Sequence, residues 1–200
     1  MAHYFTNDEV LSEEKTFTCK VKDTELKLTV DNGVFSKKGL DFGTRTLLES
    51  LDKIKGDVLD FGCGYGPIGI YLAKNFDVNV DMLDVNIRSL NLAKKNAEAN
   101  KVEVNIFESN IYENVTKKYD YIITNPPIRV GKKILYEILF GAEQHLKDNG
   151  ELWLVVHKDQ GAKSLSKDLM EKYEVNVINK NKGFFIIRAK KHWHIAKRPL

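Results

Sequence analysis

Apolar and polar residues alternate over two short stretches near the amino terminus, Thr16–Lys22 and Glu25–Val30. A period of two predicts extended strands with one buried face, and we expect these two strands to pair. A turn signal, Asp31-Asn32-Gly33, follows them. The spacing of leucine and isoleucine residues then changes to that of a helix over Gly43–Lys55.

Strand-like and helix-like patterns alternate along the rest of the chain. The predicted strands are Asp57–Phe61, Val78–Asp84, Val102–Glu108, Tyr119–Thr124, Glu151–Val156, Glu174–Asn179 and Phe184–Ala189. The predicted helices are Pro67–Asn75, Ile87–Ala99, an apolar stripe from Ile134 to Leu146 that ends at Asn149-Gly150, and Leu165–Lys172. Helical crossovers between strands require a mostly parallel sheet that is covered on both faces. The last two strands are joined by Lys180–Gly183 alone, so they must be antiparallel.

These patterns predict an α/β fold. We expect a doubly wound, mostly parallel seven-stranded sheet of the Rossmann-like kind that ends in an antiparallel hairpin, preceded by a short N-terminal β-ribbon and helix. No linker rich in proline, glycine or serine divides the chain. We therefore expect a single domain over residues 1–200, with a ribbon-and-helix extension (1–55), a core (56–191) and a basic tail (192–200).

The composition is that of an ordinary globular domain. The 200 residues are 42% hydrophobic and 10% aromatic, and this length can bury a sizeable core. No apolar run reaches membrane-spanning length, and the first residues lack the basic and apolar regions of a signal peptide. We expect a soluble cytoplasmic protein without a membrane partner.

The cysteine and histidine residues predict no metal centre. Cys19 and Cys63 form neither a disulfide framework nor a metal-ligand spacing. His157, His192 and His194 also lack the spacing of zinc ligands. Because no histidine is paired with Cys63, we interpret it as a small residue and not as a nucleophile.

The formal net charge of +3 is a property of the carboxyl-terminal end. From Arg188 onward there are five basic residues and no acidic one, and without them the 28 acidic residues outnumber the remaining basic ones by two. Such a tail can contact phosphate groups. It can equally be a frayed, solubilising chain end.

A glycine-rich segment follows the first strand of the alternating series. Residues 58–69 read Val-Leu-Asp-Phe-Gly-Cys-Gly-Tyr-Gly-Pro-Ile-Gly and lie at a strand-to-helix turn, where open parallel sheets bind ligands. Glycines there allow positive φ and a close approach of the backbone to a ligand. The alternative is a tight turn without a ligand. The candidate cofactor-binding residues of this loop are Gly62, Cys63, Gly64 and Gly66.

Two acidic residues, Asp60 and Asp84, favour a cationic nucleoside over a dinucleotide at this loop. Asp60 ends the strand before the loop, where a carboxylate would repel a pyrophosphate bound at the helix N-terminus. Asp84 ends the next strand and can accept hydrogen bonds from both hydroxyls of a ribose. S-adenosyl-L-methionine carries an ammonium and a sulfonium group and no phosphate, so both acids attract it. Asp84 can instead cap the helix that follows it.

A third candidate contact lies after the next strand, in residues 107–111. The amide of Asn110 can bond the amino edge of an adenine. It can equally be a turn residue that caps a short helix. Asn110 is thus a candidate cofactor-binding residue with a structural alternative.

Residues 125–127 read Asn-Pro-Pro and end the fourth strand of the series. Because prolines cannot donate to a sheet ladder, the strand must stop at Asn125. The side-chain oxygen of Asn125 and the carbonyl oxygen of Pro126 then form two fixed acceptors at the ligand crevice. Such acceptors can hold both hydrogens of a planar exocyclic amine and aim its lone pair at a methyl donor. We expect Asn125 and Pro126 to be catalytic, with Asn125 also beside the cofactor and no general base required.

Together, Asp60-Phe-Gly-Cys-Gly-Tyr-Gly, Asp84 and Asn125-Pro-Pro resemble the class I S-adenosylmethionine-dependent methyltransferases that modify amino groups. More closely, the chain resembles the small-subunit ribosomal RNA guanine exocyclic-amino methyltransferases in their single-domain form, the methyltransferase small domain. The resemblance covers nearly the whole chain and includes segments 33–36, 41–44, 145–147 and 150–152. It implies a Rossmann-like methyltransferase with S-adenosyl-L-methionine as cofactor. It also implies methyl transfer to a guanine, with ribosomal RNA or the small ribosomal subunit as the partner.

Two departures from this family concern recognition of the substrate. Relatives place an aromatic residue after the second proline, where this chain has Ile128 and Arg129. We therefore expect another aromatic residue, Phe35, to stack on the target base, and its alternative is a core position. Larger relatives also carry an extra N-terminal domain in place of the short extension here, so RNA must be held by other surfaces. The candidate substrate-binding residues are Phe35, Pro127, Ile128, Arg129 and Lys132, with Lys133 and the basic tail beside them.

The acceptor of the methyl group has alternatives. Asn-Pro-Pro also occurs in adenine and protein-glutamine methyltransferases, so it indicates the chemistry better than the substrate. A protein glutamine or a small amine is therefore a second hypothesis. A third is a ribosome-assembly factor that keeps the fold without turnover, and a fourth is a dehydrogenase. The modified nucleotide, the form of the RNA substrate and the oligomeric state stay open.

Overall fold

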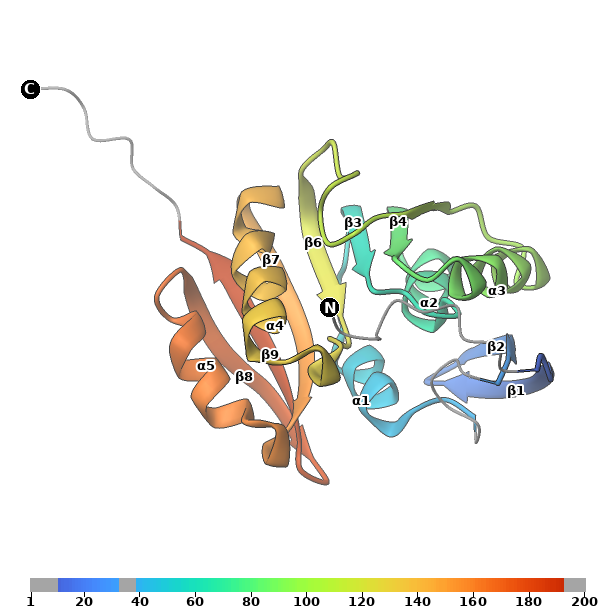
Figure 1. The fold of residues 1–200 in the computed structure, drawn as a ribbon, viewed down its shortest axis with the longest axis horizontal. Coiled ribbons are helices and arrows are strands. Elements are labelled where there is room, and N and C mark those ends of the chain that lie inside the picture. Colours follow the sequence, from blue (N-terminus) through green and yellow to red (C-terminus); the bar gives the residue numbers. More distant parts are fainter. Residues whose placement is uncertain (1–10, 33–38, 193–200) are drawn as a thin grey trace, which may run out of the picture.

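One mixed sheet organises the chain in the computed structural model, which describes residues 11–32 and 39–192 (Figure 1). Its strands lie in the order β5-β4-β3-β6-β7-β9-β8. Their bounds are β3 (Gly56–Phe61), β4 (Val78–Asp84), β5 (Asn105–Glu108), β6 (Tyr119–Thr124), β7 (Leu146–His157), β8 (Tyr173–Asn181) and β9 (Phe184–Lys191). The first five are parallel, and β9 is antiparallel to both β7 and β8. The predicted mostly parallel seven-stranded sheet with a final hairpin is confirmed.

Helices cover both faces of this sheet, as a doubly wound fold requires. They are α1 (Phe42–Ser50), α2 (Pro67–Asn75), α3 (Ile87–Ala99), α4 (Lys132–Gly141) and α5 (Ala162–Leu169), with short 3-10 turns η2 (Ile128–Val130), η3 (Ala142–His145) and η4 (Lys158–Gln160). Apolar side chains of α1, α2 and α3 share one buried cluster, and those of α4 and α5 share the other. Neighbouring residues of β3 show the alternation, since Val58 belongs to the first cluster and Leu59 to the second.

The bounds of four elements are those that the sequence predicted: α2, β4, α3 and β6. Their ends have local signals. Pro67 occupies the first helical position of α2, and the side chain of Asn86 accepts a hydrogen bond from the amide of Ser89 to begin α3. No helix within the described part of the chain has the length and apolar character needed to cross a membrane.

The prediction of one helix from Ile134 to Asn149-Gly150 is wrong at its end. Helix α4 stops at Gly141, a 3-10 turn follows, and Leu146 already belongs to β7 as the partner of Tyr119. Leu146 is fully buried in the cluster under α4. The predicted apolar stripe therefore includes residues of both α4 and β7. Periodicity alone cannot distinguish the last buried residue of the helix from the first buried residue of the strand.

Three further elements differ from their predicted bounds by three residues or more. The strand predicted from Val102 begins only at Asn105, where edge strand β5 first pairs with β4. The helix predicted to Lys55 ends at Ser50, because the chain is extended at Leu51 although that side chain is fully buried. The helix predicted over Leu165–Lys172 starts three residues earlier and ends at Leu169.

The N-terminal ribbon is a separate two-stranded antiparallel sheet, formed by β1 (Lys15–Val21) and β2 (Thr24–Val30). Its apolar side chains are buried in the cluster that also contains those of α2 and α3. Arg88 of α3 forms an ion pair with Asp31 at the end of β2, with 2.9 Å between nitrogen and oxygen. The ribbon is thus part of the packed domain.

Two asparagines, Asn96 in α3 and Asn100 at its C-cap, form hydrogen bonds with the edge of β2 as a neighbouring strand would. Asn96 accepts from the amide of Thr29 (2.7 Å) and donates to its carbonyl (2.9 Å), and Asn100 makes the same pair of bonds with Lys27 (3.1 and 2.8 Å). The Nδ2 of Asn96 also donates to the carbonyl of Tyr65, 2.8 Å away in the glycine-rich loop. Asn96 therefore joins the ribbon to that loop.

We expect Asn96→Ala to lower the free energy of unfolding by roughly 2–5 kcal/mol. The substitution leaves the backbone amide and carbonyl of Thr29 without the Asn96 side chain as partner, and each unsatisfied buried group costs about 1–3 kcal/mol. Urea unfolding measures the change. Asn91→Ala, on the exposed side of the same helix, is the control and should change stability by less than about 0.5 kcal/mol. Equal effects of the two substitutions would contradict the structural role of Asn96.

Candidate active site

The glycine-rich loop lies between β3 and α2 at the carboxyl edge of the parallel strands (Figure 1). Glycine is favoured at two positions for different reasons. Gly64 has φ +55° with open space around it, so only the backbone angle favours glycine there. At Gly66, with φ +96°, a Cβ would also lie 2.9 Å from the end of the Met82 side chain. This places the start of α2 directly against β4.

Asp84 holds the loop to the end of β4. One oxygen of its carboxylate accepts from the amide of Gly64 and the other from the amide of Asn86, both at 2.9 Å. Burial raises the pKa of Asp84, and the hydrogen bonds from Asn86, Gly64 and Val85 oppose this rise. The alternative that Asp84 caps α3 is wrong, because the side chain of Asn86 caps that helix. A carboxylate has about four acceptor positions, and three backbone amides leave Asp84 capacity for a further donor.

Asp60 is fully buried beneath the same loop. Its Oδ2 accepts from the amide of Gly69 in the first turn of α2, at 2.8 Å, whereas its Oδ1 has no hydrogen-bond partner within the described residues. The pKa of Asp60 is raised to about 7. Burial is the largest cause and raises it, the hydrogen bond from Gly69 lowers it, and the charge of Asp84 raises it. A buried acceptor without a donor is costly unless a ligand completes it.

Cys63 is buried in the loop, and its amide donates to the carbonyl of Leu83, 2.8 Å away on β4. Burial and the charges of Asp60 and Asp84 raise the pKa of its thiol well above the usual value. A thiol that holds its proton is a poor nucleophile. This agrees with the interpretation of Cys63 as a packing residue.

Asn110 lies where the sequence placed it, after the strand next to β4, and its side chain is exposed. The amide of Ser109 donates to the carbonyl of Asp84 (3.0 Å), so this turn is adjacent to the Asp84 carboxylate. Asn110 also forms the predicted turn, since its carbonyl accepts from Glu113. Ile111 has φ +53°, a strained angle for a β-branched residue.

Asn125 follows β6, directly beside β3 in the sheet. Its Nδ2 donates to Oδ2 of Asp41 (3.2 Å) and to Oγ1 of Thr44 (3.0 Å), so both of its hydrogens are used. Thr124 fixes the strand end beneath it by donating to the carbonyl of Phe61 at 2.8 Å. Among the described residues, no donor is bound to the Asn125 side-chain oxygen.

The contact with Asp41 fixes the orientation of the Asn125 side-chain amide. A carboxylate only accepts hydrogen bonds, so the nitrogen of Asn125 must face Asp41 and its oxygen must face away. Asp41 is itself fixed, because it accepts from the amide of Thr44 at 2.8 Å and so begins α1. The oxygen of Asn125 therefore faces away from Asp41 and keeps its capacity to accept a hydrogen bond.

The sequence did not assign functions to Asp41 and Thr44. Residues 41–44 were identified only as part of a family resemblance, and their local pattern is typical of an ordinary helix start. The contact with Asn125 spans 84 residues along the chain. The resemblance itself was thus the one signal that marked these residues.

The segment after Asn125 is divided between core and surface. Ile128 is half-buried and packs against the cluster under α4, whereas Arg129 and Lys132 are exposed. The ammonium of Lys132 lies 4.9 Å from the ring centre of Tyr136. Phe35, the predicted stacking residue, and the tail from residue 193 onward lie outside the described residues.

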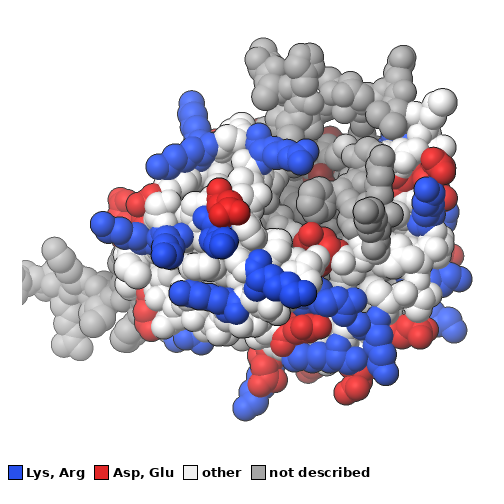
Figure 2. All heavy atoms as spheres, turned by 90° about the horizontal axis from the view of Figure 1, so that it is seen from below, with Lys and Arg blue, Asp and Glu red and all other residues white. Residues whose placement is uncertain are grey.

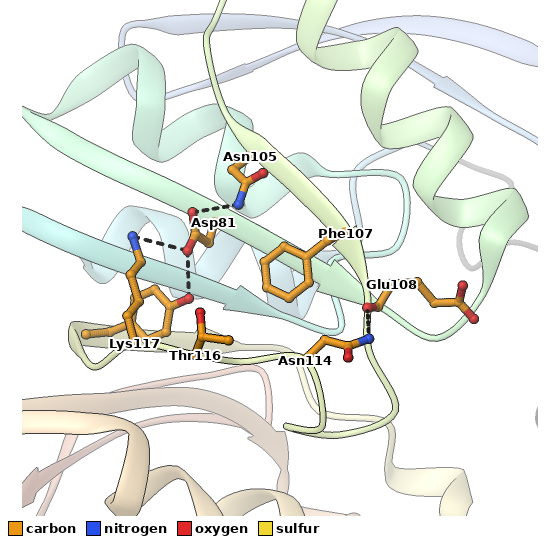
Figure 3. A pocket seen from close by; sticks show the side chains of 8 residues that line it. Asp81, Asn105, Phe107, Glu108, Asn114, Thr116 and Lys117 are labelled. Carbon is orange, nitrogen blue, oxygen red and sulfur yellow. Dashed lines mark hydrogen bonds and ion pairs between the residues drawn. The ribbon is translucent and has the colours of Figure 1, made fainter.

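A separate cavity of about 450 Å³ lies beside β4 and β5 (Figure 3). It contains none of the predicted site residues. Its central carboxylate, Asp81, accepts from the Tyr119 hydroxyl (2.7 Å) and the Asn105 amide (3.3 Å) and forms an ion pair with Lys117 (3.2 Å). These side chains satisfy one another, so we assign the candidate active site to the carboxyl edge. Within residues 11–32 and 39–192, no group of three His, Cys, Asp or Glu side chains is placed to bind a metal ion.

Comparison with known proteins agrees with this fold. The family model named methyltransferase small domain matches residues 25–188. The uncharacterized protein YbxB of Bacillus subtilis is 44% identical, over 94% of this chain and 98% of its own. Ribosomal RNA small subunit methyltransferase C of Vibrio parahaemolyticus is 35% identical, over 88% of this chain and 53% of its own.

A solved structure shows the same fold. The 16S rRNA N2 G1207 methyltransferase (RsmC) of T. thermophilus, in complex with AdoMet and guanosine, superposes with a TM-score of 0.80 and 25% identity over 90% of this chain and 51% of its own. The chain spans about half the length of the ribosomal RNA methyltransferases that it matches. The predicted fold and enzyme class are confirmed, and the chain belongs to the methyltransferase small domain family.

Proposed function

We propose that the chain transfers a methyl group from S-adenosyl-L-methionine to an exocyclic amino group, and that this group belongs to a guanine of small-subunit ribosomal RNA. The methyltransferase class and this cofactor are those that the sequence predicted. The observation that carries the proposal is the fixed amide of Asn125, whose nitrogen is bound to Asp41 and Thr44. Residues 56–191 would form the catalytic core and residues 1–55 its extension.

The acidic residues around the glycine loop fit a cationic cofactor. Asp60 offers a buried acceptor without a partner, and Asp84 keeps acceptor capacity beside its bonds to three backbone amides. When bound, S-adenosyl-L-methionine supplies an electrophilic methyl group on a positively charged sulfur. Its charge would compensate the two neighbouring carboxylates, of which Asp84 raises the pKa of Asp60. We propose Asp60, Gly62, Cys63, Gly64, Gly66, Asp84 and Asn110 as the residues of this site.

Asn125 and Pro126 would act on the acceptor amine. The side-chain oxygen of Asn125 and the carbonyl of Pro126 are rigid acceptors, because Asp41, Thr44 and the proline rings hold them. They would bind the two amine hydrogens and direct the nitrogen lone pair toward the methyl donor. This interaction strengthens as positive charge develops on the nitrogen, so it favours the transition state over the ground state.

The choice of guanine in ribosomal RNA rests on relatives and on chemistry. The matched methyltransferases named for ribosomal RNA and the guanosine complex support it. Exposed cations at Arg129 and Lys132 near Asn125 suit a polyanionic substrate. Pro127 and Ile128 complete the proposed substrate-binding segment. A ribosomal RNA substrate would place the enzyme in the cytoplasm.

We expect Asp60→Asn to stabilise the cofactor-free protein increasingly as the pH rises. The pKa of Asp60 is raised from 3.8 to about 7, so the folded state holds a proton that the unfolded chain has released between these values, and stability falls as pH rises through this range. The gain of the variant over wild type in the free energy of unfolding should grow by roughly 2–3 kcal/mol from pH 5 to pH 8. Urea unfolding measures it.

Asp52→Asn, an exposed acid, is the control for this experiment and should show no such growth. Calorimetry at pH 8 should also show weaker binding of S-adenosyl-L-methionine to Asp60→Asn. A constant stability difference between pH 5 and pH 8 would contradict the raised pKa.

We expect Asn125→Ala to lose methyl transfer by about 100- to 1000-fold, the usual effect of removing one preorganised polar group. The assay uses radiolabelled cofactor with small ribosomal subunits and, separately, with protein extract. Cofactor affinity should stay within a few-fold, and Asn91→Ala should behave as wild type. Label found only in protein would show that the acceptor is a protein glutamine and not RNA. Cofactor binding without any methyl transfer would favour a ribosome-assembly factor.

We expect Thr44→Val to lower kcat by about 3- to 10-fold, because one hydrogen bond that orients Asn125 is lost. The KM for the cofactor should change by less than about twofold, since Thr44 contacts the amide and not the loop. Thr44→Ser keeps the hydroxyl and should restore kcat. Equal rates for the valine and serine variants would show that the hydroxyl does not position Asn125.

A further inference from the structure

The carboxyl edge of the sheet is divided by charge. On one side of Asn125, acidic residues lie at or next to the carboxyl ends of strands β3, β4 and β5: Asp60, Asp84 and Glu108. On the other side, in the order β6-β7-β9-β8, the chain places basic residues at the strand ends. These are Arg129, Lys132 and Lys133 after β6, Lys158 after β7, and Lys180 and Lys182 at the hairpin of β8 and β9. Figure 2 faces this edge, and Lys and Arg side chains gather over the half that carries α4 and α5.

The lysines at β7 and at the hairpin, Lys158, Lys180 and Lys182, are here named the hairpin lysines. All three are exposed, and within residues 11–32 and 39–192 none of them forms an ion pair. Their one acidic neighbour in the same turns is Asp159, which lies 3.4 Å from the ring nitrogen of His157. Free ammonium groups at a site edge are suited to phosphate.

Aromatic packing fixes the hairpin lysines relative to Asn125. The Phe184 ring lies 5.8 Å from Phe42 and 4.9 Å from His157, centre to centre, and a Cβ on Gly43 would come within 2.8 Å of it. The hairpin thus packs against the start of α1, where Asp41 holds Asn125.

Three further contacts hold the hairpin lysines in place. The ammonium of Lys182 lies 4.9 Å from the Phe42 ring centre, and that of Lys180 lies 4.6 Å from Phe185. The amide of Lys158 donates to the carbonyl of Gly183 at 2.7 Å, which joins η4 to the hairpin. The three charges are therefore carried by one packed unit and not by a loose loop.

We propose that the hairpin lysines bind the sugar–phosphate backbone of the RNA strand that leads away from the target nucleotide. This inference rests on the proposed RNA substrate. Three inter-strand spacings separate β6 from β8, which is roughly 15 Å along the edge. The acidic half of the edge repels phosphate and attracts the sulfonium cofactor, so the strand runs over the basic half.

The test is the salt dependence of RNA binding. We compare wild type with Lys158→Gln/Lys180→Gln/Lys182→Gln by fluorescence anisotropy on a labelled 20-nucleotide single-stranded RNA of mixed sequence. Each lost phosphate contact lowers the slope of log K against log salt by about 0.7, so the slope should fall by about 2. This corresponds to roughly 50-fold weaker binding at 0.15 M salt.

The matched control is Lys55→Gln/Lys94→Gln/Lys118→Gln, which removes the same charge from exposed lysines away from this edge. Its slope should match that of wild type. An unchanged slope in the hairpin variant, or an equal fall in the control, would overturn the inference. The titration involves no methyl transfer, and Asn125→Ala should keep the wild-type slope while it loses activity. Failure of the RNA-binding inference is therefore distinguishable from failure of the proposed reaction.

Discussion

A carboxylate can only accept hydrogen bonds, and this constraint at Asp41 governs the candidate active site. Asp41 receives two donors, the amide of Thr44 and the side-chain nitrogen of Asn125. The first bond begins α1, and the second turns the oxygen of Asn125 away from α1. One side chain thus couples the start of a helix on one face of the sheet to a polar group at the end of β6. The chemistry proposed for Asn125 requires that coupling, because a freely rotating amide would present its nitrogen as often as its oxygen.

The same edge of the sheet is divided by charge. Asp60 and Asp84 lie under and beside the glycine loop, and basic side chains follow the strands on the other side of Asn125. In the proposed reaction, the cationic methyl donor and the polyanionic acceptor would approach Asn125 from opposite sides without competing for the same groups. Parallel strands produce this arrangement, because their carboxyl ends all meet at one edge.

Part of this site works against folding stability. Asp60 is fully buried with one oxygen unpartnered, and its raised pKa shows that the fold disfavours the charged form. The loop above it is held by other contacts, notably Asn96, which binds both β2 and the carbonyl of Tyr65. A well-held loop above one carboxylate oxygen without a hydrogen-bond partner is expected where a bound ligand supplies the missing partner.

The sequence by itself determined the order of the elements, the mostly parallel sheet and the placement of Asp60, Asp84 and Asn125 at its carboxyl edge. These follow from apolar periodicity and from glycine and proline positions, which act locally. It failed at Leu146, where one apolar stripe passes from helix to strand. Only the tertiary structure decided that Asp41 and Thr44 bind Asn125, that Asn96 binds the glycine loop, and that the hairpin packs on α1. Those contacts join residues far apart in the chain, and they depend on strand order and on the packing of helices against the sheet, which no local pattern encodes.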